Sequence, residues 1–264
     1  MLKSKKSKAC PTMSKEEKIL ECHIKSLVLE KLIKSGFSKN ETTLISELTL
    51  NNFSRRVDLA VINKESFIGF EIKSEYDSLK RLEGQLSTYS AYFDKVIVVA
   101  STKHINNILE SVPKNIGIWE VRDNKIIIKR KGIKKYTKNK KNLIQLMRVD
   151  ELKKLARSLN IKTNSMLRAD LEETLIKHPT SVLKSHVLNS LSDRFKKSSN
   201  KFFDSISESN NITSENIYLL SRFHEKRKIN ASRNQLKKRA WEGINKKTKE
   251  EILLGLAKFK KRVK

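Results

Sequence analysis

Three charged side chains, placed at or near the ends of apolar runs, could together cleave a phosphodiester bond. Asp58 precedes one apolar run, and Glu71 and Lys73 close the next. Because alternate side chains of a strand point to opposite faces, Glu71 and Lys73 would share a face. Asp58 and Glu71 could hold Mg²⁺ or Mn²⁺ against a scissile phosphate, with Lys73 beside the attacking water. An ordinary ion pair between Asp58 and Lys73 is the alternative.

The charge balance favours a polyanionic partner. The 264 residues include 57 basic and 29 acidic side chains, a net charge of +28, and such a field attracts nucleic acid first. Residues 1–128 hold 21 basic and 16 acidic side chains, whereas residues 129–264 hold 36 and 13. The candidate catalytic residues therefore lie in the half of the chain whose charges nearly cancel, and most of the excess positive charge lies in the other half. This separation favours two modules.

Other features exclude several classes of protein. Two cysteines provide neither a disulfide framework nor a paired-cysteine zinc site. No apolar run approaches the roughly 18 residues that span a bilayer, and the basic N-terminus lacks the apolar core of a secretory signal. The seven glycines form no phosphate-binding loop, and the five histidines have no metal-ligand spacing. We expect a soluble cytoplasmic protein that does not associate with membranes.

Hydrophobic periodicity predicts an α/β domain over residues 14–128, after a disordered basic arm over residues 1–13. The first helix ends near Gly36, which fits a C-terminal stop. The predicted order is α-β-β-β-α-β, and the second helix begins at an Asp77 cap and runs to about Phe93. The predicted strands are 43–50, 57–62, 66–73, 95–100, 116–121 and 125–129, and a short helix covers 103–110. The fourth strand is apolar throughout, as in the middle of a mixed sheet.

Residues 129–141 carry eight basic and no acidic side chains and mark a boundary. This segment could be an extended, solvated linker or a strip that follows phosphates, and the two interpretations are compatible. Residues 142–264 are predicted to form an all-helical, basic, nucleic-acid-binding region. Its predicted helices are 149–158, 168–176, 182–196, 212–226 and 248–259. The last 43 residues hold 16 basic and 4 acidic side chains, so we expect them to bind backbone without reading sequence.

The surroundings of the three charged residues resemble the PD-(D/E)xK, or restriction-endonuclease-like, nuclease superfamily. The similarity is to a group of small, uncharacterised bacterial and phage proteins; it covers about residues 15–200 and is sharpest over 44–100. It rests on Glu47-Leu48, Arg56-Val57-Asp58, Gly69-Phe70-Glu71-Ile72-Lys73-Ser74, residues 77–82, Gln85, Tyr89 and Phe93-Asp94. The resemblance implies a restriction-endonuclease-like αβββαβ core with a mixed sheet, Mg²⁺ or Mn²⁺ as cofactor, and hydrolysis of phosphodiester bonds.

By position, the resemblance implies that Asp58 and Glu71 are metal-binding acids and that Lys73 is the catalytic lysine. Gln85 and Tyr89 match a glutamine-x3-tyrosine element that some members of the superfamily carry on the following helix. The resemblance therefore implies that these two residues are catalytic as well. Residues four apart share a helix face, so both side chains could reach one phosphate or the water shell of the metal. The alternative for this pair is a surface amide and a half-buried ring.

Further site residues follow from the same resemblance. Glu47 is the strand glutamate characteristic of the group, and it could ligate a metal ion or pair with Arg55 or Arg56. Other superfamily members supply an acid from the first helix, where Glu21 and Glu30 are candidates. The residues expected to contact nucleic acid are Arg56, Lys80, Arg81, Lys129, Arg130, Lys131, Lys134 and Lys135.

Residues 149–176 resemble the helix-extended-loop-helix modules of the SAP or Rho N-terminal type, which dock on DNA or RNA. An ordinary two-helix hairpin is the alternative. The sequence as a whole predicts a Mg²⁺- or Mn²⁺-dependent DNA nuclease with a basic helical extension. The alternative is a non-catalytic nucleic-acid-binding or regulatory protein that retains the nuclease fold. RNA stays open as a substrate, and duplex cleavage by one site per chain would favour a homodimer.

Overall fold

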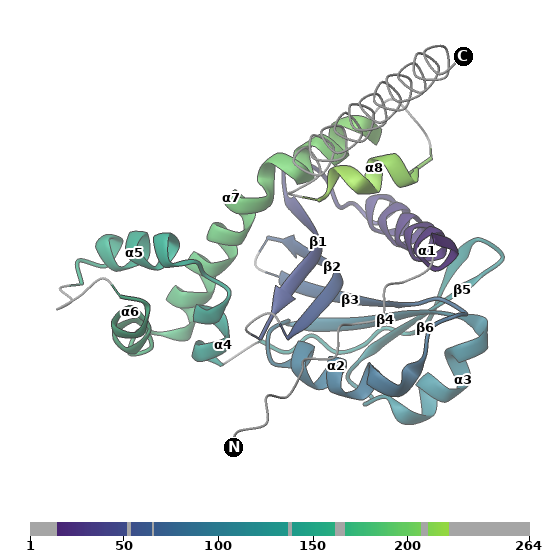
Figure 1. Cartoon of the computed structure of the whole chain (residues 1–264), viewed down its shortest axis with the longest axis horizontal. Helices are drawn as coiled ribbons and strands as arrows, with labels where there is room; N and C mark the ends of the chain where they lie inside the picture. The colour runs from purple at the N-terminus through teal and green to yellow at the C-terminus, as the bar shows by residue number, and fades with distance from the viewer. Residues whose placement is uncertain are drawn as a thin grey trace, which may run out of the picture. The chain divides into compact units, whose positions relative to one another are not determined.

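A six-stranded mixed sheet lies between helices on both of its faces, and its strands follow one another in chain order (Figure 1). The strands are β1 (Thr42–Leu50), β2 (Arg55–Asn63), β3 (Ser66–Lys73), β4 (Lys95–Ser101), β5 (Gly117–Arg122) and β6 (Lys125–Arg130). The first three strands form an antiparallel meander, β3, β4 and β5 are parallel, and β6 returns antiparallel. Parallel neighbours need crossover connections, and two helices provide them here.

The computed structural model describes residues 15–51, 54–64, 66–136, 139–161, 167–206 and 211–221. These residues belong to a compact unit that ends at Ser221. The basic arm predicted over residues 1–13 and the helix predicted over 248–259 lie outside the described residues. Along the described ranges, no helix is both long and apolar enough to cross a membrane.

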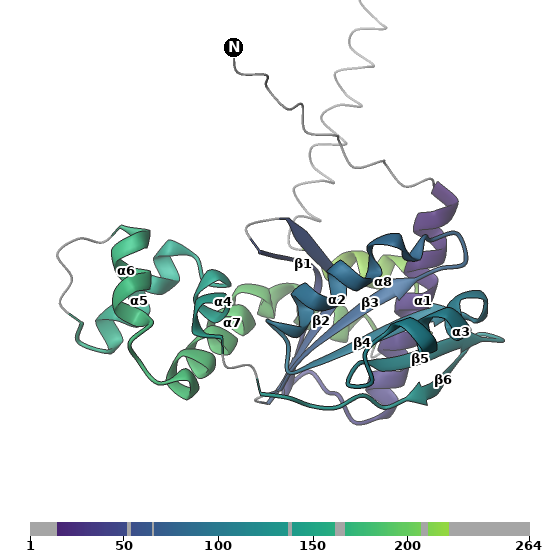
Figure 2. The same cartoon turned by 90° about the horizontal axis from the view of Figure 1, so that it is seen from below.

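The helices sort onto the two faces of the sheet (Figures 1 and 2). One face is covered by the crossovers, which are η1 (Leu79–Arg81) with α2 (Leu82–Ser90), and α3 (Thr102–Ser111); the other is covered by α1 (Lys15–Lys34) and α8 (Ser214–Leu219). In β3, Phe67 packs in the core on the α2 side, whereas Phe70 and Ile72 pack in the core on the α1 side. The two faces predicted for this strand are therefore confirmed.

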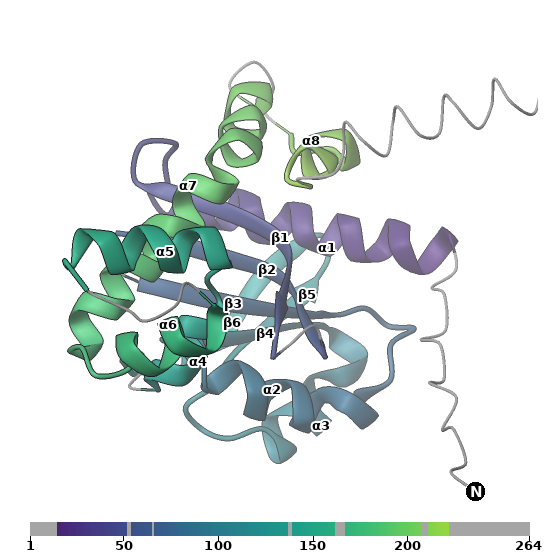
Figure 3. The same cartoon turned by 60° about the vertical axis from the view of Figure 1, so that its left-hand side comes forward.

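The helical region is continuous with the sheet domain. It contains α4 (Lys140–Gln145), α5 (Val149–Ser158), α6 (Arg168–Leu175) and the long α7 (Thr180–Ile206). The first half of α7 shares one apolar core with α4, α5 and α6, and that core continues under α2. The second half runs beside β1 (Figure 3), where the Ser199 hydroxyl accepts a hydrogen bond from Leu44 N at 3.0 Å.

The described part of the segment predicted as a linker is fixed to the sheet domain. Ile133 N donates to Asn115 O at 2.8 Å, and Lys135 N donates to Asp94 O at 2.7 Å. The buried Asp94 carboxylate also accepts from Lys184 of α7 at 2.7 and 2.8 Å. The sheet and the helices up to Ser221 are therefore held together by charge as well as by apolar packing.

The predicted order α-β-β-β-α-β is observed, and the predicted strands agree with the structure to within two residues. The N-cap prediction was wrong. Asp77 turns back to accept from Ser74 N at 2.7 Å and from the Ser74 hydroxyl at 2.6 Å. Ser78 caps the helical segment instead, and its side chain accepts from Lys80 N. Two donors on Ser74 compete for the Asp77 carboxylate more effectively than the helix start does.

Candidate active site

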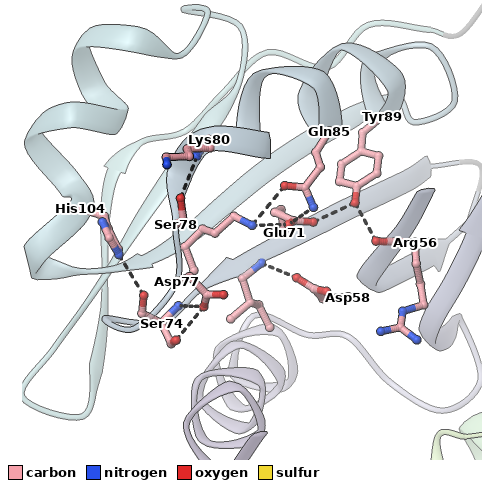
Figure 4. A network of polar contacts seen from close by, with 12 residues as sticks. Arg56, Asp58, Glu71, Ser74, Asp77, Ser78, Lys80, Gln85, Tyr89 and His104 are labelled. Carbon is pink, nitrogen blue, oxygen red and sulfur yellow. Dashed lines mark hydrogen bonds and ion pairs between the residues drawn. The ribbon is translucent and has the colours of Figure 1, made fainter. Parts of the chain in front are cut away.

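Asp58 lies where β2 and β3 separate. Strand pairing ends at Leu59 and Phe70, and the Asp58 carboxylate then accepts a hydrogen bond from Ile72 N at 2.7 Å (Figure 4). The side chain thus takes the place of the next strand-to-strand bond. Because the backbone N–H of Ile72 is satisfied in this way, the strands can part without leaving a buried donor unpaired.

The strand alternation is interrupted at the same point. Val57 and Leu59 are two residues apart, yet they pack in the cores on opposite sides of the sheet. In the neighbouring strand, Glu47 lies between the residues paired with these two and has a φ of 58°. A left-handed conformation is unfavourable for a residue with a Cβ, so the irregularity is a local strain beside Asp58.

Glu71 and Lys73 lie on one face of β3, under the helix α2. Lys73 Nζ is 2.8 Å from Glu71 Oε1 and 3.1 Å from Gln85 Oε1. The Gln85 amide in turn donates to Glu71 Oε1, and the Tyr89 hydroxyl lies 2.9 Å from Glu71 Oε2 (Figure 4). The same hydroxyl is 2.7 Å from Arg56 O. Lys73, Gln85 and Tyr89 therefore meet at the Glu71 carboxylate, and the Tyr89 hydroxyl also links this network to the Arg56 carbonyl.

The charged groups of this network are buried, so their charges cost free energy unless neighbouring groups compensate them. Glu71, Lys73 and Tyr89 are at most 4 % exposed. Burial, together with the charge of Glu71 and then that of Glu21, raises the pKa of Asp58 well above its usual range. Burial and the Glu71 charge likewise raise the pKa of Tyr89, so the phenol stays protonated. Several carboxylates act on one another here, and a cation would relieve their repulsion.

The first helix contributes a charged pair to the same region. Lys25 is buried, and its Nζ lies 3.2 Å from Glu21 Oε1 and 3.5 Å from the Ser46 hydroxyl of β1. Burial lowers the pKa of Lys25, but the charges of Glu21 and Asp58 outweigh it, and the net shift is upward. Of the two acids weighed on this helix, Glu21 faces the site.

Glu30, the other acid weighed on this helix, lies 4.0 Å from Lys34 in an exposed pair. Glu47 is 3.7 Å from Arg56 Nη1, which is the ion-pair alternative for that residue. Among the residues that the structure describes, no group of three or more His, Cys, Asp or Glu side chains is arranged to hold a metal ion. Glu71 is thus the acid in the network around Lys73, and Asp58 lies next to it in the fold, bonded to Ile72 N.

The turn after Lys73 is a feature that the sequence did not reveal. Besides the Asp77 bonds, Ser74 O lies 3.0 Å from the Nε2 atom of the buried His104 (Figure 4). Lys103 Nζ donates to Glu75 O at 2.9 Å. These contacts from α3 fix the loop that leads from the candidate site into α2. No local pattern links residues 74 and 104, so only the fold could show the connection.

The residues predicted to contact nucleic acid lie at the surface: Arg130 is half-buried and the other seven are exposed. Several of them have structural partners. Lys129 pairs with Glu120 at 3.0 Å, and the Arg130 guanidinium donates to the carbonyls of Ile116 and Val112. Lys134 donates to the Ser66 hydroxyl at 2.6 Å, and Arg56 is the partner of Glu47 given above. These contacts hold the fold together whether or not the same side chains also contact a polyanion.

Comparisons with known proteins place the chain among phage proteins. It is 32 % identical over 211 residues to "Protein cII" of Enterobacteria phage P4, covering 78 % of this chain and 79 % of that protein. A solved protein of unknown function from Silicibacter pomeroyi matches with a TM-score of 0.35 and 14 % identity, over 52 % of this chain and 88 % of the other. The model of the family described as "Bacteriophage P4 protein cII" matches residues 14–221, so the chain belongs to the bacteriophage P4 cII protein family.

Proposed function

We propose that this protein is a metal-dependent DNA nuclease of the PD-(D/E)xK superfamily, with a basic helical extension that binds DNA. The observation that carries the proposal is the network in which Glu71 joins Lys73, Gln85 and Tyr89, beside an Asp58 held at the point where two strands part. The strand pattern and the net charge of +28 support it.

The acids fit a magnesium or manganese ion. Mg²⁺ is commonly held by one or two carboxylates, with water and substrate phosphate completing its coordination. Asp58 and Glu71 would supply those ligands, and within the described residues only one Asp58 oxygen takes a hydrogen bond, from Ile72 N. The bound ion would polarise the phosphate and lower the pKa of a water molecule.

The chain's own residues would orient the reactants. The Lys73 ammonium, 2.8 Å from Glu71, would stabilise charge that develops on the phosphate oxygens. Gln85 and Tyr89 hold the two oxygens of Glu71 from the same helix face, so the carboxylate keeps one orientation. Lys80 and Arg81, exposed in η1 just before α2, would contact the DNA backbone.

A nucleic-acid-binding protein without hydrolytic activity is the second candidate. The charge distribution favours it, because 36 of the 57 basic residues lie after residue 128. Binding to backbone phosphates requires charge and no catalytic network. RNA remains an alternative substrate under both proposals, and a homodimer would bring two sites to the two strands of a duplex.

The test is cleavage of supercoiled, linear and single-stranded DNA with Mg²⁺ or Mn²⁺. We expect Lys73→Ala and Glu71→Gln to lose at least about 10²-fold in rate, the scale of removing one transition-state contact. Lys114→Ala, which removes an exposed lysine between α3 and β5, is the matched control and should keep the wild-type rate. Circular dichroism of each variant checks the fold.

Metal-dependent cutting that survives both substitutions would contradict the proposed site. Salt-sensitive DNA binding without cutting by the wild type, in either metal, would favour the binding protein. RNA in place of DNA in the same assay decides the substrate class.

A further inference from the structure

Lys25 is a buried lysine in α1 with no role in the proposed chemistry. It is 3 % exposed, and the carboxylate within ion-pair distance is Glu21, at 3.2 Å. Taking an ammonium group out of water costs several kcal/mol unless charges or hydrogen bonds replace the solvent. An aliphatic residue would pack here without that cost, so the charge itself needs an explanation.

The surroundings of Lys25 supply one. Its Nζ reaches the Ser46 hydroxyl at 3.5 Å, and Ser46 pairs with Leu59, the residue after Asp58. The ammonium therefore lies against β1 at the place where the neighbouring strand carries Asp58. The carboxylates of Glu21 and Asp58 both act on Lys25, and the carboxylates of Glu71 and Glu21 both act on Asp58. Lys25 is thus the positive charge on the α1 side of the acids, as Lys73 is on the α2 side.

We propose that Lys25 is the internal counter-ion of the candidate site: it balances Asp58 and Glu21 in the metal-free protein and opposes a divalent cation at Asp58. Lys25 is then a positioning residue that sets metal affinity, and it does not touch the substrate. The effect of Lys25 on metal affinity, the metal half of this inference, rests on the proposed function. The pairing of Lys25 with the acids in the metal-free protein does not.

Removing the Lys25 charge should destabilise the metal-free protein but not the metal-bound protein. Lys25→Met keeps most of the side-chain volume and removes the charge. In EDTA the uncompensated carboxylates should lower Tm by about 10 °C, since breaking a buried pair is strongly destabilising. With saturating Mn²⁺ the bound ion neutralises the carboxylates in place of Lys25, so the Tm of Lys25→Met should equal that of wild type. The Kd for Mn²⁺ should fall by about 10²-fold or more, the change in affinity that closing a Tm gap of about 10 °C requires.

Two further variants separate charge balance from packing. Lys34→Met removes a lysine from the same helix whose partner Glu30 is also four residues before it, but whose side chain is 78 % exposed; its Tm should match wild type in both conditions. Glu21→Gln combined with Lys25→Met removes both charges of the buried pair. This double variant should recover most of the lost Tm in EDTA.

The experiment is differential scanning calorimetry of the four full-length proteins in EDTA and in a Mn²⁺ series, with calorimetric titration of Mn²⁺. An unchanged Tm of Lys25→Met in EDTA would overturn the inference. So would a Tm gap that persists in Mn²⁺ while wild type itself is stabilised by the ion. If Lys25→Met does not fold in EDTA, the double variant decides: folding near the wild-type Tm supports charge balance, and failure to fold refutes it.

A wild type that Mn²⁺ does not stabilise is a different result. It would count against the proposed metal site and refute the metal half of the inference. Recovery of Tm in the double variant would still support Lys25 as the counter-ion of the acids.

Discussion

Asp58→Asn should stabilise the metal-free protein while abolishing its proposed activity. Asn keeps the size of the side chain and an oxygen that can accept from Ile72 N, the bond observed at 2.7 Å. What it removes is a carboxylate whose pKa burial, Glu71 and Glu21 raise. A residue that lowers the stability of the fold in this way is expected where function requires the charge.

The sign of the pH dependence follows from the raised pKa. A carboxyl group that is harder to ionise in the folded state favours folding below its unfolded pKa, near 4, and loses that contribution as pH rises through the folded value. Wild type should therefore lose stability over this range relative to Asp58→Asn. The difference should be small near pH 4 and largest above the raised pKa of Asp58.

The size of the effect is a balance of two terms. Each unit of raised pKa corresponds to about 1.4 kcal/mol of folding free energy above that pKa. The Ile72 bond changes from charge-assisted to neutral, which costs about 1 kcal/mol. Because the pKa of Asp58 is raised well above its usual range, the gain should exceed this cost, and each net 1 kcal/mol would raise Tm by about 2–4 °C for a domain of this size.

Urea unfolding in EDTA at several pH values between 4 and 8 measures this difference. Asp123→Asn, in the exposed turn between β5 and β6 where φ is already 50°, is the matched control and should show no pH-dependent gain. An Asp58→Asn protein less stable than wild type at pH 8 would refute the reasoning. A stability difference that does not change with pH would also refute it.

Three further predictions test the network and the boundary of the folded unit. Tyr89→Phe keeps the buried ring but leaves Glu71 Oε2 without the hydroxyl 2.9 Å away; we expect a loss of about 1–3 kcal/mol in urea unfolding and a slower cleavage rate. Arg194→Met should cost about 3–5 kcal/mol in the same assay, because it leaves the buried Glu151 carboxylate without its partner from α7. Residues 222–264 hold 16 basic and 4 acidic side chains. Their deletion should leave the Tm of the unit ending at Ser221 unchanged and should flatten the salt dependence of DNA binding. A Tm that falls by 5 °C or more, or an unchanged salt slope, would contradict this.

Local sequence patterns were sufficient to predict the positions of the strands and the face of the sheet on which their side chains lie. The apolar run within residues 66–73 predicts a strand that coincides with β3, and the two-residue period of a strand places Glu71 and Lys73 on one face. The four-residue interval likewise puts Gln85 and Tyr89 on one side of α2, where both contact Glu71, while their contact with a phosphate or with the water shell of a metal stays a prediction. These features depend on neighbours in the chain, which is why sequence could predict them.

The division into modules could not be predicted in the same way. Charge changes sharply near residue 129, but packing does not follow charge: Leu183 and Val187 of α7 belong to the apolar core that also contains Leu86 of α2. Deleting residues 142–264 would therefore expose that core. Lys25 was missed for a related reason. A Glu-x3-Lys interval on a helix usually marks an exposed pair, and only the approach of β1 buries this one.

The departures from regular structure meet at one place. Glu47 has a left-handed backbone, the alternation of β2 changes between Val57 and Leu59, and the pairing of β2 with β3 stops beside Asp58. A strand that served only to fill the core would gain stability by continuing the alternation and by replacing Asp58 with an apolar residue. Backbone strain and a half-buried charge that coincide where two strands separate are typical of functional sites. Backbone conformation and packing alone therefore mark the surroundings of Asp58 as a candidate functional site, independently of the sequence motif.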